Sequence, residues 1–177
     1  LSGDTGELKL VMDQIDVMSC TTPAIGDVDG DGFPEIVTMS KRGGLINWVV
    51  IEHDGTEKFR FGGSSPSLGG APLIADLDGD GQVELVTNGF IYNGANGQRI
   101  SSIAYTGNSL NVGIPISADL NLDGTQELVL GRRAMRMDGT LVYQTGSHRD
   151  ENGFSAVGNF DADAFPEIVT TSAGSFL

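Results

Sequence analysis

The chain has 177 residues, which is the length of one domain or slightly more. Its 24 acidic residues outnumber its 10 basic residues, and the formal net charge is −14. This balance argues against nucleic-acid binding and against docking on an anionic membrane, because both require a basic surface. No apolar run reaches the roughly 18 residues of a membrane-spanning helix. The 26 glycines and the hydrophobic content of 39% together predict a folded domain that is rich in turns.

The opening segment predicts a glycine turn, SGDTGE from Ser2, followed by a strand over residues 7–13. The chain starts LSGDTGE, with neither an initiator Met nor a signal peptide, so we expect it to be part of a longer protein. Cys20 is its single cysteine, which excludes an intrachain disulfide.

Four strand-sized segments follow within the next 40 residues or so. They are rich in Ile, Val, Thr and aromatic residues, and they read PAIGD from Pro23, EIVTMS from Glu35, LINWVVIEH from Leu45 and EKFRF from Glu57. The Asp-Gly pair at Asp54 between the last two segments is a strong hairpin signal.

The same unit recurs along the rest of the chain. Its most regular part reads PAIGDVDGDGFPEIVT from Pro23, PLIADLDGDGQVELVT from Pro72, PISADLNLDGTQELVL from Pro115 and SAVGNFDADAFPEIVT from Ser155. Each copy contains an acidic loop, at residues 27–35, 76–84, 119–127 and 159–167, and these loops begin 49, 43 and 40 residues apart. Four short strands in a repeat of this length are typical of a β-propeller blade.

The fold prediction is therefore all-β, with residues 1–177 forming a single region of four propeller repeats. No stretch of ten or more residues has a helical period. Two arrangements remain open. The chain could close as a four-bladed ring whose last blade is built from both ends, or it could form part of a larger propeller.

The acidic loops predict metal sites. In the first loop, carboxylates stand at positions 1, 3, 5 and 9, and glycine at position 6. Four converging carboxylates repel one another unless a cation binds them. Ca²⁺ accepts six to eight oxygen ligands, whereas Mg²⁺ prefers fewer carboxylates. An EF-hand is excluded because position 12 holds Thr38, Thr87, Leu130 or Thr170 in place of its glutamate.

The four loops differ in their ligands. The third has Asn121 at position 3, which carries one charge fewer, and the fourth has Ala164 in place of the glycine. We therefore expect about three calcium ions, with weak binding or none at the fourth loop. The expected ligands, including the carbonyl oxygen of position 7, are Asp27, Asp29, Asp31, Phe33 and Glu35; Asp76, Asp78, Asp80, Gln82 and Glu84; Asp119, Asn121, Asp123, Thr125 and Glu127; and Asn159, Asp161, Asp163, Phe165 and Glu167.

The loop pattern, repeated in register over nearly the whole chain, resembles the FG-GAP and VCBS family of calcium-binding propeller repeats, which includes the integrin α-subunit head. The resemblance implies that each loop links the first two strands of a blade, and that an intact ring has about seven blades. The chain departs from the family pattern by having Glu instead of Asp at position 9.

The sequence specifies the fold more closely than it specifies the function. No Ser-His-Asp or Cys-His set and no phosphate-binding loop is evident, and the clustered carboxylates are assigned to metal loops. We predict a non-enzymatic, extracellular or cell-surface calcium-binding module for adhesion, ligand binding or assembly, whose partner is a protein or a glycan. The alternative is the propeller part of a secreted polysaccharide lyase or another glycan-active enzyme, since some polysaccharide lyases resemble this repeat.

Overall fold

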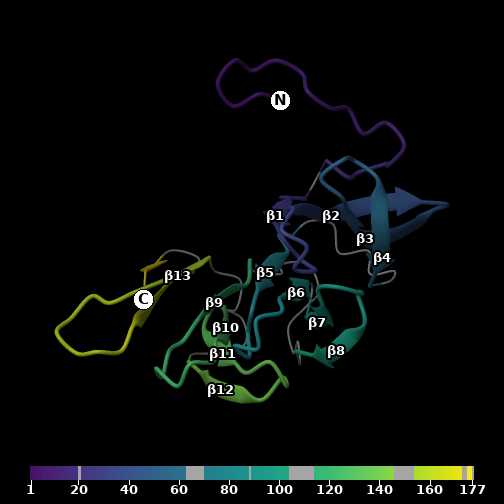
Figure 1. Ribbon diagram of the computed structural model, residues 1–177. Coiled ribbons are helices and arrows are strands. Elements are labelled where there is room, and N and C mark those ends of the chain that lie inside the picture. The colour runs from purple at the N-terminus through teal and green to yellow at the C-terminus, as the bar shows by residue number, and fades with distance from the viewer. Residues whose placement is uncertain are drawn as a thin grey trace.

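The computed structural model of the chain describes residues 1–19, 21–62, 70–87, 89–103, 114–145, 154–172 and 175–176. Within these residues every regular element is a β-strand, and the strands form four antiparallel sheets (Figure 1). The prediction of an all-β chain is thus confirmed. Cys20 lies outside the described residues.

The strands follow one another along the chain, and each sheet is built from consecutive strands. Sheet 1 contains β1 (Ala24–Gly26), β2 (Glu35–Arg42), β3 (Leu45–Ile51) and β4 (Glu57–Phe61). Sheet 2 contains β5 (Leu73–Ala75), β6 (Glu84–Thr87), β7 (Phe90–Asn93) and β8 (Arg99–Ser102). Sheet 3 contains β9 (Ile116–Ala118), β10 (Glu127–Leu130), β11 (Arg133–Met135) and β12 (Leu141–Gln144). Sheet 4 contains β13 (Ser155–Gly158), β14 (Glu167–Ser172) and β15 (Ser175–Phe176).

The sheets lie in sequence order, with contacts between the first strands of neighbouring sheets, β1 with β5 and β9 with β13. As described, they do not close into a ring, and the two chain ends lie well apart in Figure 1. The four-stranded repeats predicted from the sequence are therefore found in sheets 1 to 3, whereas propeller closure stays a prediction.

The predicted strand over residues 7–13 is wrong. These residues form no strand, and sheet 4 has three strands in its described part. A strand needs a partner for its backbone groups, and the alternating pattern of ELKLVMD found none here. The N-terminal segment instead runs along sheet 1, where Val17 bridges Ser40 and the Met18 N–H donates to the Met39 carbonyl at 2.9 Å.

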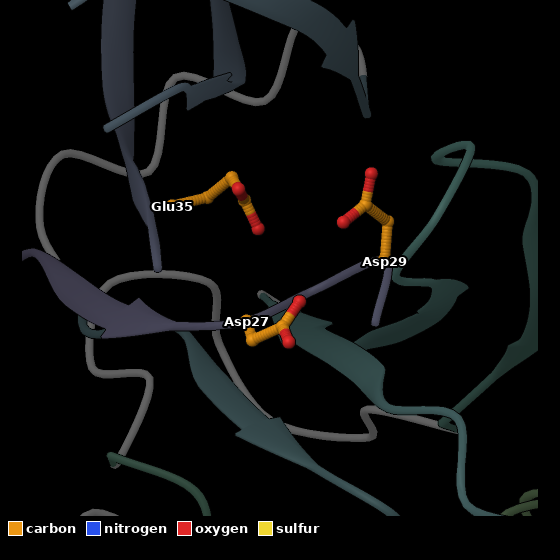
Figure 2. Close-up of side chains that lie close together, drawn as sticks. All are labelled: Asp27, Asp29 and Glu35. Carbon is orange, nitrogen blue, oxygen red and sulfur yellow. The ribbon is translucent and has the colours of Figure 1, made fainter. Parts of the chain in front are cut away.

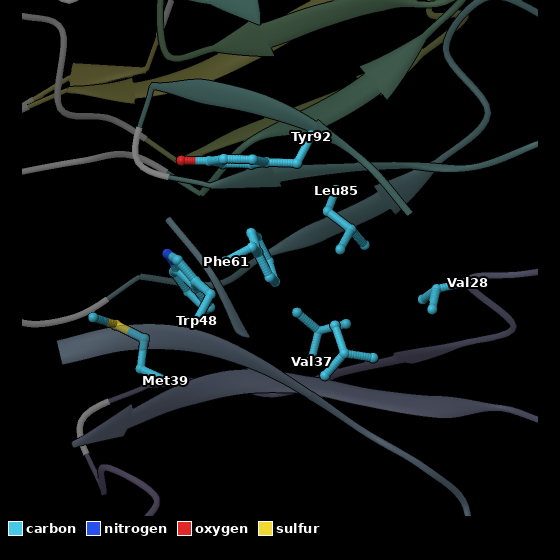
Figure 3. Packing of buried hydrophobic residues seen from close by; sticks show 8 residues of the cluster. Val28, Val37, Met39, Trp48, Phe61, Leu85 and Tyr92 are labelled. Carbon is cyan, nitrogen blue, oxygen red and sulfur yellow. The ribbon is translucent and has the colours of Figure 1, made fainter. Parts of the chain in front are cut away.

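The largest core cluster lies between sheets 1 and 2 (Figure 3). Its buried members are Val28, Val37, Met39, Trp48, Val50, Phe61, Leu85 and Tyr92. The rings of Phe61 and Tyr92 meet edge to face, with centroids 4.9 Å apart, which is a favourable aromatic geometry. Trp48 is thus a core residue, as its alternation with Ile46 and Val50 predicts.

Alternation along the central strands lets one sheet pack on two neighbours. In β6, Leu85 joins the cluster with sheet 1, whereas the next residue, Val86, joins a second cluster with Leu128 and Leu130 of sheet 3. Successive strand residues point to opposite faces, so sheet 2 contributes to two cores. This stacking holds the sheets in a series and sets their loops in equivalent places.

One irregularity recurs in three sheets. The ladder between the third and fourth strands is interrupted by a β-bulge, which leaves Lys58 in sheet 1, Ile100 in sheet 2 and Val142 in sheet 3 without a Cα partner. A bulge adds one residue to a strand and changes the direction of the side chains beside it. The three residues are therefore structurally equivalent.

Candidate metal centre

The four acidic loops occupy the same place in the four sheets, because each joins the first strand to the second. Loop 1 (residues 27–35) joins β1 to β2, loop 2 (76–84) joins β5 to β6, loop 3 (119–127) joins β9 to β10, and loop 4 (159–167) joins β13 to β14. The glutamate at position 9 is in every case the first residue of the second strand. The sheet therefore fixes the position of one expected ligand, and the turn must fold the other side chains towards it.

The aspartate at position 1 organises the turn. Both carboxylate oxygens of Asp27 accept backbone hydrogen bonds, from Gly30 N at 2.7 Å and from Gly32 N at 2.9 Å. Asp76 accepts the equivalent bonds in loop 2, at 2.8 and 2.9 Å. Gly32 has a φ of +90°, a conformation that residues with a Cβ rarely adopt, which explains the glycine at position 6.

In loops 1 to 3 the glutamate at position 9 is buried beneath the turn. One of its oxygens accepts a hydrogen bond from the backbone N–H of position 2, over 2.8 Å for Glu35, 2.9 Å for Glu84 and 2.9 Å for Glu127. These residues are 0%, 3% and 1% exposed. Acidic side chains are rarely so deeply buried without a positively charged partner.

Burial changes the ionisation of two of these glutamates. For both Glu35 and Glu84 it raises the pKa above the ordinary value of 4.5, and it outweighs the lowering effect of the N–H donors at Val28 and Leu77. Negatively charged loop aspartates raise both pKa values further. The arrangement is thus electrostatically unfavourable for the charged carboxylates of the protein alone.

The structure brings three carboxylates together in three of the loops. One oxygen from each of Asp27, Asp29 and Glu35 lies within 4.8 Å of the others, and Figure 2 shows the three side chains turned towards a common space. The corresponding group in loop 2 is Asp76, Asp78 and Glu84. The group in loop 4 differs, because Asp161, Asp163 and Glu167 stand at positions 3, 5 and 9 of that loop. Asp80, at position 5 of loop 2, is not part of such a group; its Oδ1 accepts a hydrogen bond from Gln82 N at 2.8 Å.

Loop 3 keeps the fold of the turn but not the carboxylate group. Glu127 accepts the Leu120 N–H and Asp119 accepts the Gly124 N–H as in loops 1 and 2, at 2.9 Å each. The other oxygen of Asp119 accepts from Asp123 N at 3.1 Å, which is position 5, whereas loops 1 and 2 use the N–H of position 4. At position 3, the amide of Asn121 donates to Asp123 at 2.9 Å and to Glu127 at 3.2 Å. Its nitrogen therefore fills part of the space between the two carboxylates, and its oxygen accepts from Asp123 N at 2.9 Å.

Loop 4 departs from the others at positions 1 and 6. Asn159 donates its amide to the Asp163 carbonyl at 2.8 Å, where an aspartate would accept backbone bonds. Ala164 is absent from the residues with positive φ, which include the position-6 glycine of each other loop. An alanine Cβ disfavours that conformation, so this turn follows a different path. The loop 4 group of three carboxylates thus lies in a turn built differently from the others.

Position 7 presents its side chain to solvent. Phe33 and Phe165 are 54% and 51% exposed, and their backbone N–H groups donate to the position-5 aspartates at 2.8 and 2.7 Å. Gln82 and Thr125 make the same backbone bond, at 2.8 and 2.9 Å. All four residues share this backbone bond, and the side chains of Gln82 and Thr125 also donate to the same position-5 aspartate.

Two residues outside the loops also belong to the first site. Lys58, at the bulge of β4, places its Nζ 2.6 Å from Asp29 Oδ2 and 2.6 Å from Glu52 Oε1. One oxygen of Glu52 also lies within 4.8 Å of oxygens from Asp31 and Glu35. Hydrogen bonding to Lys58 lowers the pKa of Asp29, and the two carboxylates raise that of Lys58.

The turn that carries these two residues touches loop 1 at a second point. His53, which follows Glu52, stacks on Phe33, with ring centroids 4.5 Å apart.

Sequence reasoning missed Glu52 and Lys58 because they lie outside the repeated motif. The available signal was strand register: Ile36 pairs with Ile51, which places residue 52 beside Glu35.

Comparison with known proteins supports the repeat. Residues 27–87, which include loops 1 and 2, match the family model of the FG-GAP-like repeat, so the resemblance predicted from the loops is confirmed there. No curated protein sequence matches the chain.

Among solved structures, the V. cholerae biofilm matrix protein Bap1 is similar, with 29% sequence identity and a TM-score of 0.66. The similarity covers 87% of this chain but only 24% of the Bap1 chain. The rhamnogalacturonan lyase PL11 of Bacillus licheniformis is more distant, with 15% identity and a TM-score of 0.48 over 86% of this chain and 46% of that one. No helix in the described part of this chain is long and apolar enough to cross a membrane.

Proposed function

Because residues 27–87 carry an FG-GAP-like repeat, we propose that the chain is a calcium-binding β-propeller module without enzymatic activity. It acts outside the cell or on its surface, in adhesion, ligand binding or assembly. Its sheets are the blades of a ring, either four-bladed or larger.

One observation carries the calcium assignment. Glu35 is fully buried; its Oε2 accepts the Val28 N–H, but its Oε1 has no hydrogen-bond partner. The Glu35 side chain is turned, with those of Asp27 and Asp29, towards a common space (Figure 2). A buried carboxylate oxygen without a partner is costly, and so is the repulsion among the acids around it. A cation bound to these oxygens offsets both costs.

The chemistry of the oxygens favours Ca²⁺ over other ions. The ligands are carboxylates and carbonyls, with no cysteine or histidine in the loops, and hard oxygen donors select Ca²⁺ or Mg²⁺. Several carboxylates in a flexible turn suit the larger ion, since Mg²⁺ retains most of its waters. The proposed ligands are those expected from the sequence, with sites in loops 1 to 3. Loop 4 is the weak site because of Asn159 and Ala164.

The extracellular setting rests on two points. Bap1, to which the chain is similar, is a biofilm matrix protein. Extracellular modules bind Ca²⁺ with Kd values of about 10⁻⁴ to 10⁻³ M, which turn-based sites of this kind can reach. A protein or glycan is the proposed partner.

Isothermal titration of calcium into chelator-treated protein tests the central claim. We expect about three ions to bind at millimolar calcium or below, and magnesium to bind more weakly. Flat heats up to several millimolar calcium would overturn the metal assignment.

Thermal melting of three variants tests which loops bind calcium. Calcium bound only by the folded state stabilises it by about 2.7 kcal/mol per site at 100 times Kd. Asp31→Ala and Asp80→Ala should therefore lower the melting temperature in calcium and have little or a stabilising effect in EDTA. Asp163→Ala in loop 4 is the matched control and should depend much less on calcium. Equal losses of stability in EDTA and in calcium for Asp31→Ala would identify loop 1 as a hydrogen-bonded turn only.

A screen against acidic polysaccharides tests the absence of enzymatic activity. We expect no release of unsaturated products from pectic or other uronate polymers, with or without calcium. Cleavage that survives repurification of the protein would favour the lyase alternative.

A further inference from the structure

We propose that the hairpin between β3 and β4 controls the metal affinity of loop 1, with Glu52 as a fifth carboxylate of the site and Lys58 as an internal counter-ion that calcium must displace. The inference rests on the proposed function, since it concerns the same cation site. It assigns a role to two residues that lie outside the repeated loop motif.

The ammonium group of Lys58 already sits at the edge of the site. Its Nζ is 2.6 Å from Asp29 Oδ2 and 2.6 Å from Glu52 Oε1, and the side chains of all three residues are about one-fifth exposed. Asp29 is therefore engaged by a cation of the protein itself. Calcium at loop 1 must share or take over this oxygen, and the lysine must move away from the metal.

Glu52 adds a further carboxylate to the site. One of its oxygens lies within 4.8 Å of oxygens from Asp31 and Glu35. These three residues form a group that does not include Asp29, which Lys58 contacts. Release of Lys58 would free Glu52 Oε1 as well as Asp29 Oδ2. The same movement thus opens two carboxylates to the metal.

An independent observation indicates that Lys58 is an incomplete substitute for the metal. Glu35 Oε1 is buried and has no hydrogen-bond partner, and the Glu35 side chain belongs to the group of carboxylates (Figure 2). An ammonium group with three donors satisfies Asp29 and Glu52 but leaves this oxygen unmatched. A divalent ion with six to eight oxygen ligands can bind it.

The equivalent positions in sheets 2 and 3 lack this pair. In sheets 1 to 3 a residue at the end of the third strand or directly after it closes the hairpin, with its N–H donating across the turn: Glu52 to Thr56, Asn93 to Gln98, and Arg136 to Thr140, at 2.8, 2.9 and 2.9 Å. The position of Glu52 thus holds a neutral residue in sheet 2 and a cation in sheet 3. The bulge position of Lys58 holds Ile100 and Val142.

The formal charge of the site sets the expected changes in calcium affinity. Loop 1 has four carboxylates, and Glu52 and Lys58 together leave the formal site charge at −4. Calcium affinity in such loops is set by the charge of the ligands and by the rigidity of the site. Lys58→Met changes the charge to −5 and removes the competing cation, so calcium should bind about tenfold more tightly. Glu52→Gln changes it to −3 and should weaken binding by about tenfold.

The experiment is a calcium titration in which loop 1 dominates the signal. A parent carrying Asp80→Asn and Asp123→Asn weakens loops 2 and 3, while each asparagine oxygen can still accept the backbone bond of the native aspartate. Lys58→Met, Glu52→Gln and the double variant are made in this parent. Lys41→Met is the matched control, because it removes the same charge from an exposed position at the end of β2.

The proposal expects tighter binding for Lys58→Met, weaker binding for Glu52→Gln, and a double variant close to the parent, because its formal charge is again −4. The double variant also serves if Lys58→Met alone folds poorly in EDTA. Equal affinities for Lys58→Met, Lys41→Met and the parent would overturn the proposal while leaving calcium binding intact. Absence of calcium binding by the wild-type chain would instead overturn the proposed function.

Discussion

Glu84 is the residue whose environment most directly predicts a pH effect. It is 3% exposed, it has no lysine comparable to Lys58, and burial first, then the aspartates of loop 2, raise its pKa above 4.5. A carboxyl whose pKa is higher in the folded state than in the unfolded state binds more protons when folded. Its contribution to stability is therefore lost as the pH rises above about 4.5.

Without calcium, we expect the part of the unfolding free energy that depends on Glu84 to fall as the pH is raised from about 4.5 to 7. Glu84→Gln keeps an acceptor for the Leu77 N–H, so it should be more stable than wild type at pH 7 in EDTA and similar to it below pH 4.5. Urea unfolding across this range measures the difference. A variant with the same pH slope as wild type would contradict the expectation.

The opposite sign applies to Asp29. Its pKa is lowered below the ordinary value of 3.8, chiefly by the hydrogen bond from Lys58. Its stabilising contribution is therefore present above about pH 3.8 and is lost as the pH falls below that value. The contributions of Asp29 and Glu84 to stability should thus change in opposite directions with pH in the absence of metal.

At the residue scale, the sequence predicts the turn geometry that the spacing of neighbouring residues determines. The alternate acids and the glycine of loops 1 and 2 lie within nine residues, so their turn geometry is local and readable. Glu52 and Lys58 were missed because their approach to Asp29 depends on the pairing of β2, β3 and β4 and on a bulge. Pairing across strands brings together residues that no local pattern connects.

At the scale of a single element, the turn of loop 2 requires glycine for its backbone alone. Gly81 has a φ of +88°, and a Cβ placed there meets no atom within 4 Å. Gly81→Ala should therefore lose about 1–2 kcal/mol of unfolding free energy through backbone strain, with and without calcium. Gly3→Ala is the matched control, since Gly3 also has open space around it but no positive φ.

Denaturant unfolding of both variants measures the effect. Equal stabilities for Gly81→Ala and Gly3→Ala would show that this φ is not required by the fold. The same backbone requirement explains the different turn of loop 4, where Ala164 has no positive φ and Asn159 donates to the Asp163 carbonyl.

Strand prediction succeeded where both partners of a pair are close in sequence. The hairpin of β2 and β3 follows from apolar alternation and the Gly43-Gly44 turn, and its register extends from Ile36–Ile51 to Arg42–Leu45. Residues 7–13 have a similar alternation but no partner strand nearby. Leu8 and Leu10 remain 68% and 50% exposed, so the alternation there does not report burial.

At the scale of the whole molecule, the acidic loops concentrate the charge. Loops 1 and 2 contain four acids each and loops 3 and 4 contain three each, which is 14 of the 24 acidic residues. Bound calcium would neutralise part of this charge, and dissolved salt screens the rest over a Debye length of about 10 Å at 0.1 M.

We therefore expect sodium chloride to stabilise the calcium-free protein. Raising it from about 0.05 to 0.5 M should increase the melting temperature in EDTA, because screening weakens repulsion within the loops. The increase should be much smaller at saturating calcium, which is the control. Equal increases in both conditions would mean that loop repulsion contributes little to stability.

Ring closure is the part of the architecture that sequence could not determine. The repeat predicts blades because each unit must bury its faces against neighbours, and the clusters on both sides of sheet 2 show this stacking. The number of units that complete a circle depends on the small angle between sheets, which no residue pattern specifies.

The recurrent bulge has a consequence for how such repeats diversify. A side chain in a regular ladder is constrained by the residue opposite it, whereas the bulge position faces no counterpart in the third strand. The three copies accordingly hold a lysine, an isoleucine and a valine, while the strands around them keep the same pairing. After duplication of a repeat, one substitution at this position can change the charge of the new copy without altering its strand pairing. Swapping these three residues between repeats would be the most economical way to redistribute binding properties around the molecule.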